Sequence, residues 1–430
     1  MGTGRTVAYD SIQTTTIRKV RIRILPFVFL FYVTAYLDRI NIGFAALTMN
    51  KELAITSAQY GLLSGIFFLG YALFEIPSNL VLHRIGARVW MARILITWGA
   101  VAALTGLVST VHQLYSMRFL LGLAEAGYFP GILLYLTYWF PQREQARAIA
   151  LLLTGFPVTI ILGAPVSGLI LDHVHWFGVS SWRWLLVLEG LPAIVLGLLT
   201  YLVLPSRPGD AKFLDADEKY AIQAELGREE QRKLKERHYS VLQAMTSPRV
   251  WHLVLIYLGM TAGTYTLTFW GPQLVKSLSS FYSNSFVGLL VMIPSLAGLI
   301  AMIFIARSSD RMMERRYHVA IPALLGAAAL FLLSSVQAPF YSVALLSVLA
   351  LGVCSYYGPF WAIPSEFLTG FSAAAGIALI NSVGNLGAFV GPYAIGAIAE
   401  RTGNMRMGLA MVGVWLFISA TLVLLLPRKA

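Results

Sequence analysis

The sequence predicts an all-α membrane protein in which 12 transmembrane helices form two six-helix pseudo-repeats. Three observations support this fold class: an apolar composition, twelve apolar runs of bilayer length, and landmarks that recur at one offset in both halves. Of the 430 residues, 57% are hydrophobic and 12% are charged, whereas soluble domains are usually ~45–50% apolar. Because one span takes ~20 mostly apolar residues, little chain is left for a large water-soluble domain.

Long apolar runs divide the chain into twelve expected spans, each bounded by polar or charged residues. The expected spans cover residues 24–46, 58–82, 89–109, 112–139, 146–171, 184–204, 250–275, 285–306, 318–336, 340–363, 373–398 and 407–426. The polar segment before the first run lacks the apolar core of a signal peptide, so we expect the first span to direct insertion.

A polar segment dense in Asp, Glu, Lys and Arg separates the sixth span from the seventh, and we expect it to be a solvated linker with a short amphipathic helix. The expected organisation is a cytoplasmic N-terminal tail (1–23), an N-terminal six-helix bundle (24–204), a cytoplasmic linker (205–249), a C-terminal six-helix bundle (250–426) and a C-terminal tail (427–430).

The basic residues are distributed unevenly between the two sides of the expected bundle. With both termini placed in the cytoplasm, 25 of the 32 Lys and Arg residues fall on the cytoplasmic side, 5 fall outside, and Arg39 and Arg118 lie within spans. This asymmetry follows the positive-inside rule, so the net charge of +12 orients the protein and nucleic acid is not an expected partner. We expect a multi-pass plasma membrane protein that is a monomer in contact with the lipid bilayer.

Two landmarks recur at the same offset along the chain. The loop after the second span carries Arg84 and Arg88, and the loop after the eighth carries Asp310 and Arg311; Arg84 and Arg311 are 227 residues apart (311 minus 84). The fifth span has a proline at position 165 and the eleventh has one at position 392, again 227 apart (392 minus 165). One offset at two distant places favours a duplicated half, and repeats of this kind are typical of transporters that rock two halves about a midplane site.

Ionisable residues within spans are the strongest indication of function, because a charge in the membrane interior is costly unless it faces a cavity or a partner. Six residues are of this kind: Asp38, Arg39, Glu75, Arg118, Glu125 and Glu189. We interpret Glu75 and Glu189 as structural residues near helix ends, where side chains snorkel or cap.

The remaining four residues can serve either transport or packing. Arg118 and Glu125 are two helical turns apart and share one face of the fourth span, whereas Asp38 and its neighbour point about 100° apart. In the functional interpretation, Arg39 binds an anionic carboxylate and either Asp38 or Glu125 carries a proton. In the alternative, Asp38 pairs with Arg118, or Glu125 pairs with an Arg, as neutral packing.

Polar groups elsewhere are candidate ligand contacts. Tyr36 and Tyr71 have hydroxyls near the expected midplane, and Asn381 and Asn385 are one turn apart in an apolar stretch where unbonded amides are costly. The single cysteine, Cys354, and the absence of a phosphate-binding glycine loop argue against thiolate metal clusters and ATP-driven chemistry.

Four motifs resemble one transporter family. They are Tyr36-x-Asp38-Arg39-x-Asn41-Ile42-Gly43, Arg118-Phe119-x-x-Gly122-x-x-Glu125-Ala126-Gly127, Gly358-Pro359-Phe360-Trp361 and Asn381-x-x-Gly384-Asn385-x-Gly387. Together they resemble the anion:cation symporter family of the major facilitator superfamily over residues 24–426. The stretch from Pro77 to Arg88 resembles the bacterial tartrate and phthalate permease branch.

The resemblance implies roles for individual residues. Substrate binding would fall to Arg39, Tyr36, Tyr71, Asn385 and Trp361. Proton coupling would fall to Asp38, Glu125 and Arg118, and the gating loops would use Arg84, Arg88, Asp310 and Arg311. Unlike relatives that clamp a second carboxylate from the seventh span, this chain has no Arg there. A diacid would therefore be held by Arg39 with Arg118, or by neutral donors.

The function implied is a proton-coupled symporter that imports a small organic carboxylate, tartrate-like or phthalate-like, by alternating access. The location implied is a bacterial inner membrane. An organic-anion exchanger of the same fold is the alternative, and counterflow with and without a pH gradient separates the two. We expect no cofactor apart from H+ as coupling ion and no metal. No nucleophile or metal-ligand cluster accompanies the paired acids, so an enzyme is not expected.

Overall fold

The computed structural model describes residues 2–235, 241–364, 367 and 370–426, and the expected tail at 427–430 lies outside these described residues. Within them, the regular structure is helical, and 12 helical segments are long and apolar enough to cross a membrane. The fold class and the number of spans predicted from the sequence are therefore confirmed.

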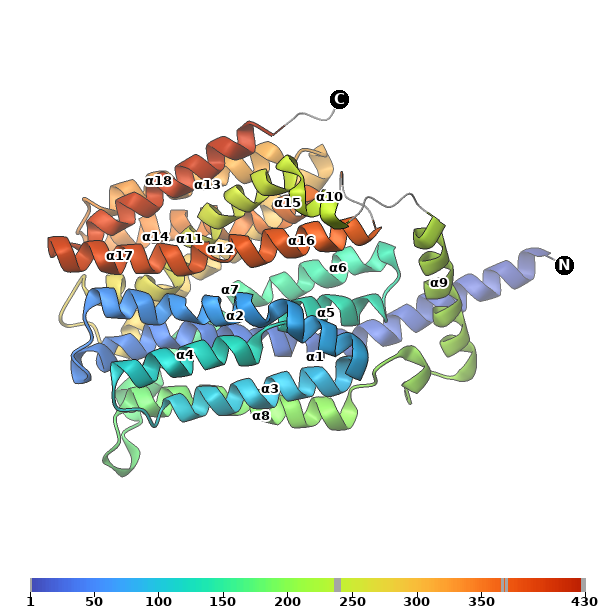
Figure 1. The fold of residues 1–430 in the computed structure, drawn as a ribbon, viewed down its shortest axis with the longest axis horizontal. Helices are drawn as coiled ribbons and strands as arrows, with labels where there is room; N and C mark the ends of the chain where they lie inside the picture. Colours follow the sequence, from blue (N-terminus) through green and yellow to red (C-terminus); the bar gives the residue numbers. More distant parts are fainter. Residues whose placement is uncertain (1, 236–240, 365–366, 368–369, 427–430) are drawn as a thin grey trace.

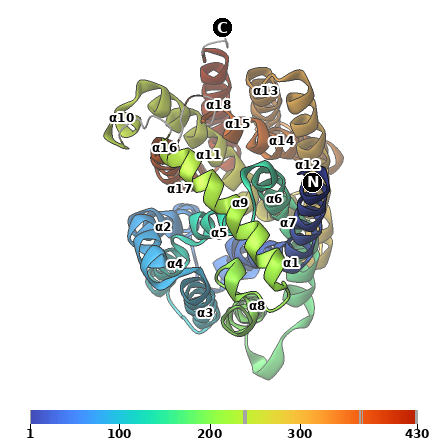
Figure 2. The same cartoon turned by 90° about the vertical axis from the view of Figure 1, so that its right-hand side faces the viewer.

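The first six spans pack as one group and the last six as another (Figures 1 and 2). The first group contains α1 (Gly2–Glu52), α2 (Ser57–Ile85), α3 (Ala87–Thr105), α4 (Val111–Glu125) with α5 (Tyr128–Thr137), α6 (Gln142–Leu153) with α7 (Gly155–His173), and α8 (Ser181–Val203). The second contains α11 (Pro248–Lys276), α12 (Asn284–Met312), α13 (Arg316–Leu333), α14 (Pro339–Ser355) with α15 (Tyr357–Ala362), α16 (Gly370–Gly384) with α17 (Gly387–Thr402), and α18 (Met405–Leu424).

Helix α1 is longer than the apolar run that predicted it. It is continuous from Gly2 to Glu52, so the helix extends through most of the expected N-terminal tail. The 38 residues at positions 5–42 contain no glycine, the residue that most weakens a helix interior after proline, and this favours continuity even through Pro26.

The linker is also more helical than expected. It contains the 20-residue α9 (Ala216–Lys235), the short α10 (Val241–Thr246) and a 3-10 turn (Pro208–Asp210). Outside the linker, a second 3-10 turn (Trp176–Gly178) precedes α8. Helix α9 is bound to the first half: Lys19 pairs with Glu218 at 2.6 Å, and Glu229 accepts from the backbone N–H of Gln142 at 3.0 Å. Figure 1 shows α9 at the same end of the bundle as the N-terminus, and this end is called the linker end below.

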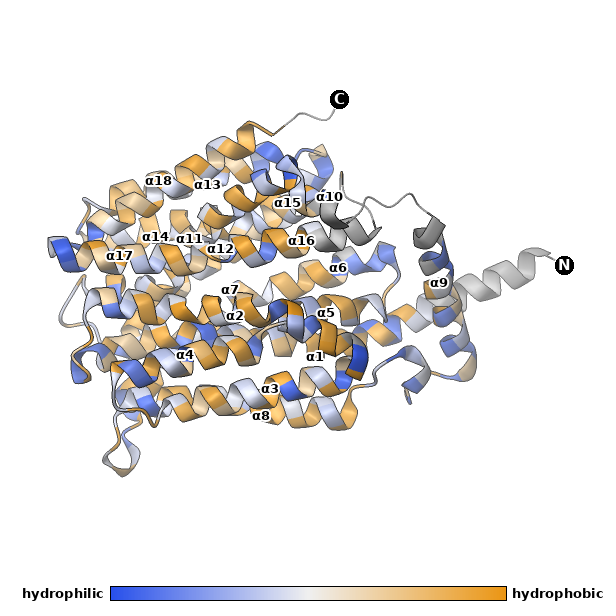
Figure 3. Ribbon diagram, in the orientation of Figure 1, coloured by the Kyte–Doolittle hydropathy of each residue, from blue (hydrophilic) through white to orange (hydrophobic). Residues whose placement is uncertain are grey.

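Hydrophobic residues predominate along the helices of the bundle (Figure 3), as a lipid environment requires. Large hydrophobic side chains are more than half exposed there, including Leu73, Leu162, Leu202 and Phe304. Because water would penalise such a surface, the exposed side chains fit hydrocarbon rather than solvent. The chain is a multi-pass membrane protein.

The two halves are closed against each other at the far end, opposite the linker. A Cβ on Gly61 of α2 would lie 2.8 Å from the carbonyl oxygen of Pro392, so the close crossing of α2 and α17 requires glycine. Where α7 meets α12, Asp172 accepts from the backbone N–H of Ser285 at 2.7 Å and from the Ser285 hydroxyl at 2.6 Å. These contacts close the space between the halves at the far end.

Candidate functional site

A cavity lies between the halves, lined by residues of both. Its lining is rich in aromatic side chains, and seven of the fifteen residues are tyrosines. The lining residues are Tyr32, Ala35, Tyr36, Arg39, Phe68, Tyr71, Tyr128, Phe129, Leu153, Tyr257, Tyr265, Tyr357, Trp361, Asn381 and Asn385. A ligand here would meet one fixed cation, neutral hydroxyl and amide donors, and ring faces.

Arg39 is the cation in this lining. Its guanidinium forms an ion pair with Glu125, donates to the hydroxyl of Tyr265 at 3.3 Å, and is 8% exposed. Its central carbon also lies 5.0 Å from the ring centre of Tyr36 and 5.3 Å from that of Tyr71, within cation–π range. The structure thus joins α1, α4 and α11 at one guanidinium.

Glu125 is the last residue of α4, and its position depends on a break in the fourth span. Gly127 has φ +79°, a left-handed conformation that side chains disfavour, and a Cβ there would lie 2.5 Å from the Ser78 hydroxyl. Glu125 is fully buried, and its second carboxylate oxygen has no hydrogen-bond partner among the described residues. Its negative charge therefore depends on Arg39, because a helix C-terminus does not stabilise an anion.

Arg118 lies close by but does not enter the cavity lining. Both guanidinium groups pack on Phe67, with the central carbons of Arg39 and Arg118 each 5.3 Å from its ring centre. In the part of the chain that the structure describes, no ion pair joins Arg118 to Asp38 or Glu125, and two of its nitrogens, Nε and Nη2, lack hydrogen-bond partners. Of the packing alternatives, the structure thus contains an Arg39–Glu125 pair and not an Asp38–Arg118 pair.

Asp38 points away from the cavity, into the first half. Its carboxylate accepts from the indole N–H of Trp98 at 2.6 Å and from the Asn41 side chain at 3.3 Å. The two adjacent residues of α1 therefore lie in different environments: Asp38 is hydrogen-bonded to α3, and Arg39 borders the cavity. The two acids proposed for proton exchange are thus not equivalent, since Glu125 contacts Arg39 directly and Asp38 does not.

The interpretation of Glu75 and Glu189 as snorkelling or capping residues is wrong. Glu75 is 3% exposed and accepts from Asn381 at 3.0 Å and from Ser382 at 2.5 Å, both on α16 of the opposite half. Glu189 is 2% exposed and accepts from Ser167 at 2.7 Å within the first half. Both acids lie well inside their helices. They are buried and hydrogen-bonded, and neither caps a helix end nor extends to the membrane surface.

The cavity brings together Tyr36 and Tyr71 from the first half with Asn385 and Trp361 from the second, and all four line it. Sequence reasoning missed the contribution of α11, which supplies Tyr257 and Tyr265. Their spacing of eight residues places them on one helical face. This polar and aromatic face in an otherwise apolar seventh span could have indicated that the span lines the cavity.

Of the four residues expected in gating loops, Arg88 and Asp310 bind within their own halves in this conformation. Arg88 donates to the Tyr201 carbonyl oxygen on α8. Arg84 and Arg311 are exposed. Asp310 pairs with Arg315 at 2.5 Å, and that guanidinium also donates to Ser309 at 2.9 Å. The contacts of Arg88 and Asp310 thus stabilise each half separately.

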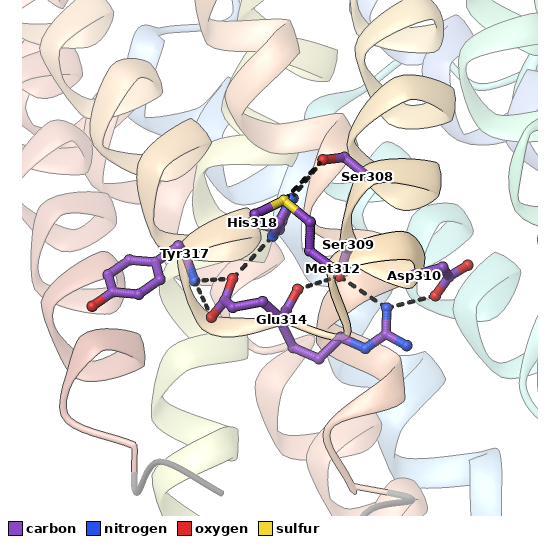
Figure 4. A network of polar contacts seen from close by, with 8 residues as sticks. Ser308, Ser309, Asp310, Met312, Glu314, Tyr317 and His318 are labelled. Atoms are coloured by element: carbon purple, nitrogen blue, oxygen red, sulfur yellow. Dashed lines mark hydrogen bonds and ion pairs between the residues drawn. The ribbon is translucent and has the colours of Figure 1, made fainter.

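Figure 4 shows the loop between α12 and α13. Here Glu314 contacts His318 and the backbone N–H of Tyr317, and His318 also contacts Ser308. Burial acts to raise the pKa of Glu314, but hydrogen bonds from Tyr317 and His318 outweigh it and hold the pKa below its ordinary value. The loop is thus tied to the start of α13 by an ionised carboxylate.

Two six-helix halves, a closed far end and a cavity between the halves that contains Arg39 define a membrane carrier. The model of the Major Facilitator Superfamily matches residues 28–392, and the chain belongs to this superfamily of transporters, not to an enzyme family. The resemblance seen in the sequence motifs is confirmed at this level.

Relatives and solved structures agree with this assignment. The chain is 42% identical over 421 residues to the “Putative tartrate transporter” of Agrobacterium vitis, covering 98% of this chain and 96% of that protein. It is 40% identical over 417 residues to the quinolone resistance transporter of Acinetobacter baumannii, covering 97% and 96%. The xylose transporter XylE from E. coli, in a partially occluded inward open conformation, shares the fold with a TM-score of 0.75 at 14% identity, covering 95% and 99%.

Proposed function

We propose that this chain is a proton-coupled symporter that imports a small organic carboxylate through the bacterial inner membrane, with both termini in the cytoplasm. The observation that carries the proposal is the ion pair between Arg39, which borders the cavity, and Glu125, which lies fully buried behind it. Proton and substrate then share one partner, the Arg39 guanidinium.

The shared guanidinium suggests how the two fluxes are coupled. When Glu125 is ionised it occupies Arg39, so an incoming carboxylate has to compete with it. A proton on Glu125 removes that competitor and leaves Arg39 free to bind the substrate carboxylate, an attraction far stronger in a low-dielectric cavity than in water. Loss of the proton on the cytoplasmic side restores the internal ion pair and displaces the substrate.

The remaining lining supports a carboxylate with an aromatic or hydroxylated body. Tyrosine faces and the Trp361 ring suit an aromatic acid, whereas tyrosine hydroxyls and the Asn385 amide suit the hydroxyls or second carboxylate of a tartrate-like acid. Arg118 lies outside the lining, so a second carboxylate would be met by neutral donors. The relatives named for tartrate and for quinolones fit this range, since tartrate is a hydroxylated dicarboxylate and quinolones are aromatic carboxylic acids.

The test is uptake by purified protein in proteoliposomes. Labelled tartrate, phthalate and hydroxybenzoate are offered at acid outside pH, with an imposed inward proton gradient and no internal substrate. We expect accumulation of at least one acid, and collapse of that accumulation by a protonophore. Uptake that occurs only with substrate inside, and is indifferent to the gradient, would instead establish an exchanger.

A further inference from the structure

We propose that Glu75, together with Asn381 and Ser382, is a gate that closes the cavity on its linker side and must part in each transport cycle. The inference rests on the chain being a two-half carrier, and it requires neither a known substrate nor proton coupling.

The contact is a complete polar latch between the halves. Asn381 donates to one oxygen of the Glu75 carboxylate at 3.0 Å, and Ser382 donates to the other at 2.5 Å. All three residues lie inside spans, and Glu75 is 3% exposed. An acid at such a place is costly without partners, so the carboxylate is stabilised by the opposite half of the molecule.

The position of the latch is that of a gate at the linker-side rim of the cavity. Glu75 lies ten residues before the end of α2 at Ile85, about 15 Å from the linker end. Phe68, which lines the cavity, lies seven residues deeper on the same helix, about 10 Å further from that end. On α16, Asn381 lines the cavity and is one turn closer to the linker end than Asn385.

Among the residues that the structure describes, the other hydrogen bonds between the halves lie at different depths in the membrane. Asp172 with Ser285, and Thr56 with Glu400 at 2.6 Å, hold the far end. Arg39 with Tyr265 crosses the level of the cavity itself. Full opening toward the linker separates α2 from α16, so the Glu75 contacts have to break while those at the far end remain.

The latch is also connected to the cavity wall. Both Asn381 and Asn385 line the cavity, and Asn385 donates to the side-chain oxygen of Asn381 at 3.2 Å, so a hydrogen bond joins Asn385 to the amide that binds Glu75. A ligand that engages Asn385 therefore acts on the group that closes the gate.

The experiment measures access to the cavity floor without any transported solute. Cys354, the single cysteine, is replaced in C354A, and F68C adds a reporter thiol deeper than the latch. Sealed vesicles are oriented with the linker outward, as checked by protease cleavage of the linker, and a membrane-impermeant maleimide is added outside. Labelling rates are compared for the reporter alone, with E75A, and with S382A.

We expect E75A to raise the labelling rate about five- to tenfold and S382A to raise it about twofold to fivefold, since hydrogen bonds to a carboxylate would otherwise hold the gate shut. The matched control is S167A, which removes a serine donor from another buried carboxylate, Glu189, but within one half; it should leave the rate unchanged. Equal rates for the reporter, E75A and S382A would overturn the gate.

A second measurement covers the case in which E75A folds poorly. In C354A, the pair E75C and S382C is oxidised, and the linker is then cut at an inserted protease site. We expect the two halves to remain one species on a non-reducing gel and to separate with dithiothreitol, whereas E189C with S382C should give separate halves. Separate halves for the E75C and S382C pair would contradict the contact itself.

Discussion

Arg39 on α1 and Glu125 at the end of α4 form an ion pair in which Glu125 is completely buried while Arg39 also borders the cavity. Removing one member of a buried pair commonly costs ~3–5 kcal/mol, because the other charge is left uncompensated. Separating the two groups in the empty carrier is therefore unfavourable, unless an event supplies a new partner or removes a charge. Protonation and carboxylate binding are two such events.

Replacing Glu125 should separate proton coupling from substrate exchange. We expect E125Q, which resembles the protonated acid, to stop pH-driven accumulation in proteoliposomes while counterflow partly survives, because Arg39 stays free for substrate at every pH. Unchanged uphill uptake would refute the assignment.

Asp38 provides the matched comparison for that variant, since it is a buried acid one residue from Arg39 without contact to it. D38N should leave substrate binding measurable, because its partners Trp98 and Asn41 lie within the first half. Accumulation that survives E125Q but is lost in D38N would place the proton on Asp38 instead.

Arg39 should be indispensable for binding. We expect R39A to abolish substrate-dependent thermal stabilisation, which for wild type amounts to about 2.7 kcal/mol at a ligand concentration 100 times Kd. R39K keeps the charge but loses the planar fork, and should retain a weakened response. Full stabilisation of R39A by the transported acid would show that the anion binds elsewhere.

The Tyr265 hydroxyl should matter for affinity and not for folding. Y265F removes the group that accepts from Arg39, and we expect Kd to rise about three- to tenfold, as for the loss of one hydrogen bond of ~1 kcal/mol. The control is Y135F, which removes a buried hydroxyl bonded to the Pro205 carbonyl outside the cavity. Equal effects of both variants on Kd, measured by the same thermal titration, would remove Tyr265 from the site.

The helix break after Glu125 should require Gly127. G127A imposes a side chain at φ +79°, at a cost of ~1–2 kcal/mol, and places its Cβ 2.5 Å from the Ser78 hydroxyl. G403A is the matched control, because Gly403 has φ +68° but no neighbouring atom within 4 Å of an added Cβ. Thermal unfolding should show a larger loss for G127A; equal losses would mean that Ser78 moves aside freely.

The loop between α12 and α13 should contribute a pH-dependent part of stability. Because the pKa of Glu314 is lowered in the folded protein, its contribution is present above the ordinary carboxyl pKa of ~4.3 and is lost as pH falls through the folded value. E314Q should therefore lower the unfolding temperature at neutral pH, with the difference from wild type shrinking in acid. A constant difference from pH 7 to pH 3 would contradict an ionised Glu314.

The spans were predictable because each depends on local composition. A run of ~20 apolar residues has to be helical in a bilayer, whatever it packs against. Helix ends were less predictable: α1 continues through most of the expected tail, and α9 is longer than expected, since continuity there depends on helix propensity and on contacts such as Lys19 with Glu218.

The sequence predicted which residues form the site, but not which of them contact one another. A guanidinium and carboxylates inside spans point to a cavity because they are costly in lipid, and Arg39 does border the cavity with Tyr36 and Tyr71. The sequence left open whether Glu125 would bind an Arg. It also placed Glu75 near a helix end.

Hydropathy and charge along the chain thus determine that this protein crosses the membrane twelve times and carries ionisable groups inside it. The tertiary structure alone decides that Arg39 contacts Glu125 and Tyr265, that Asp38 turns to Trp98, and that Glu75 joins the opposite half. The physical reason is that side-chain partners across helices depend on the rotation and depth of each helix. Close contacts such as Gly127 against Ser78 set that rotation and depth, and no periodicity within one span records them.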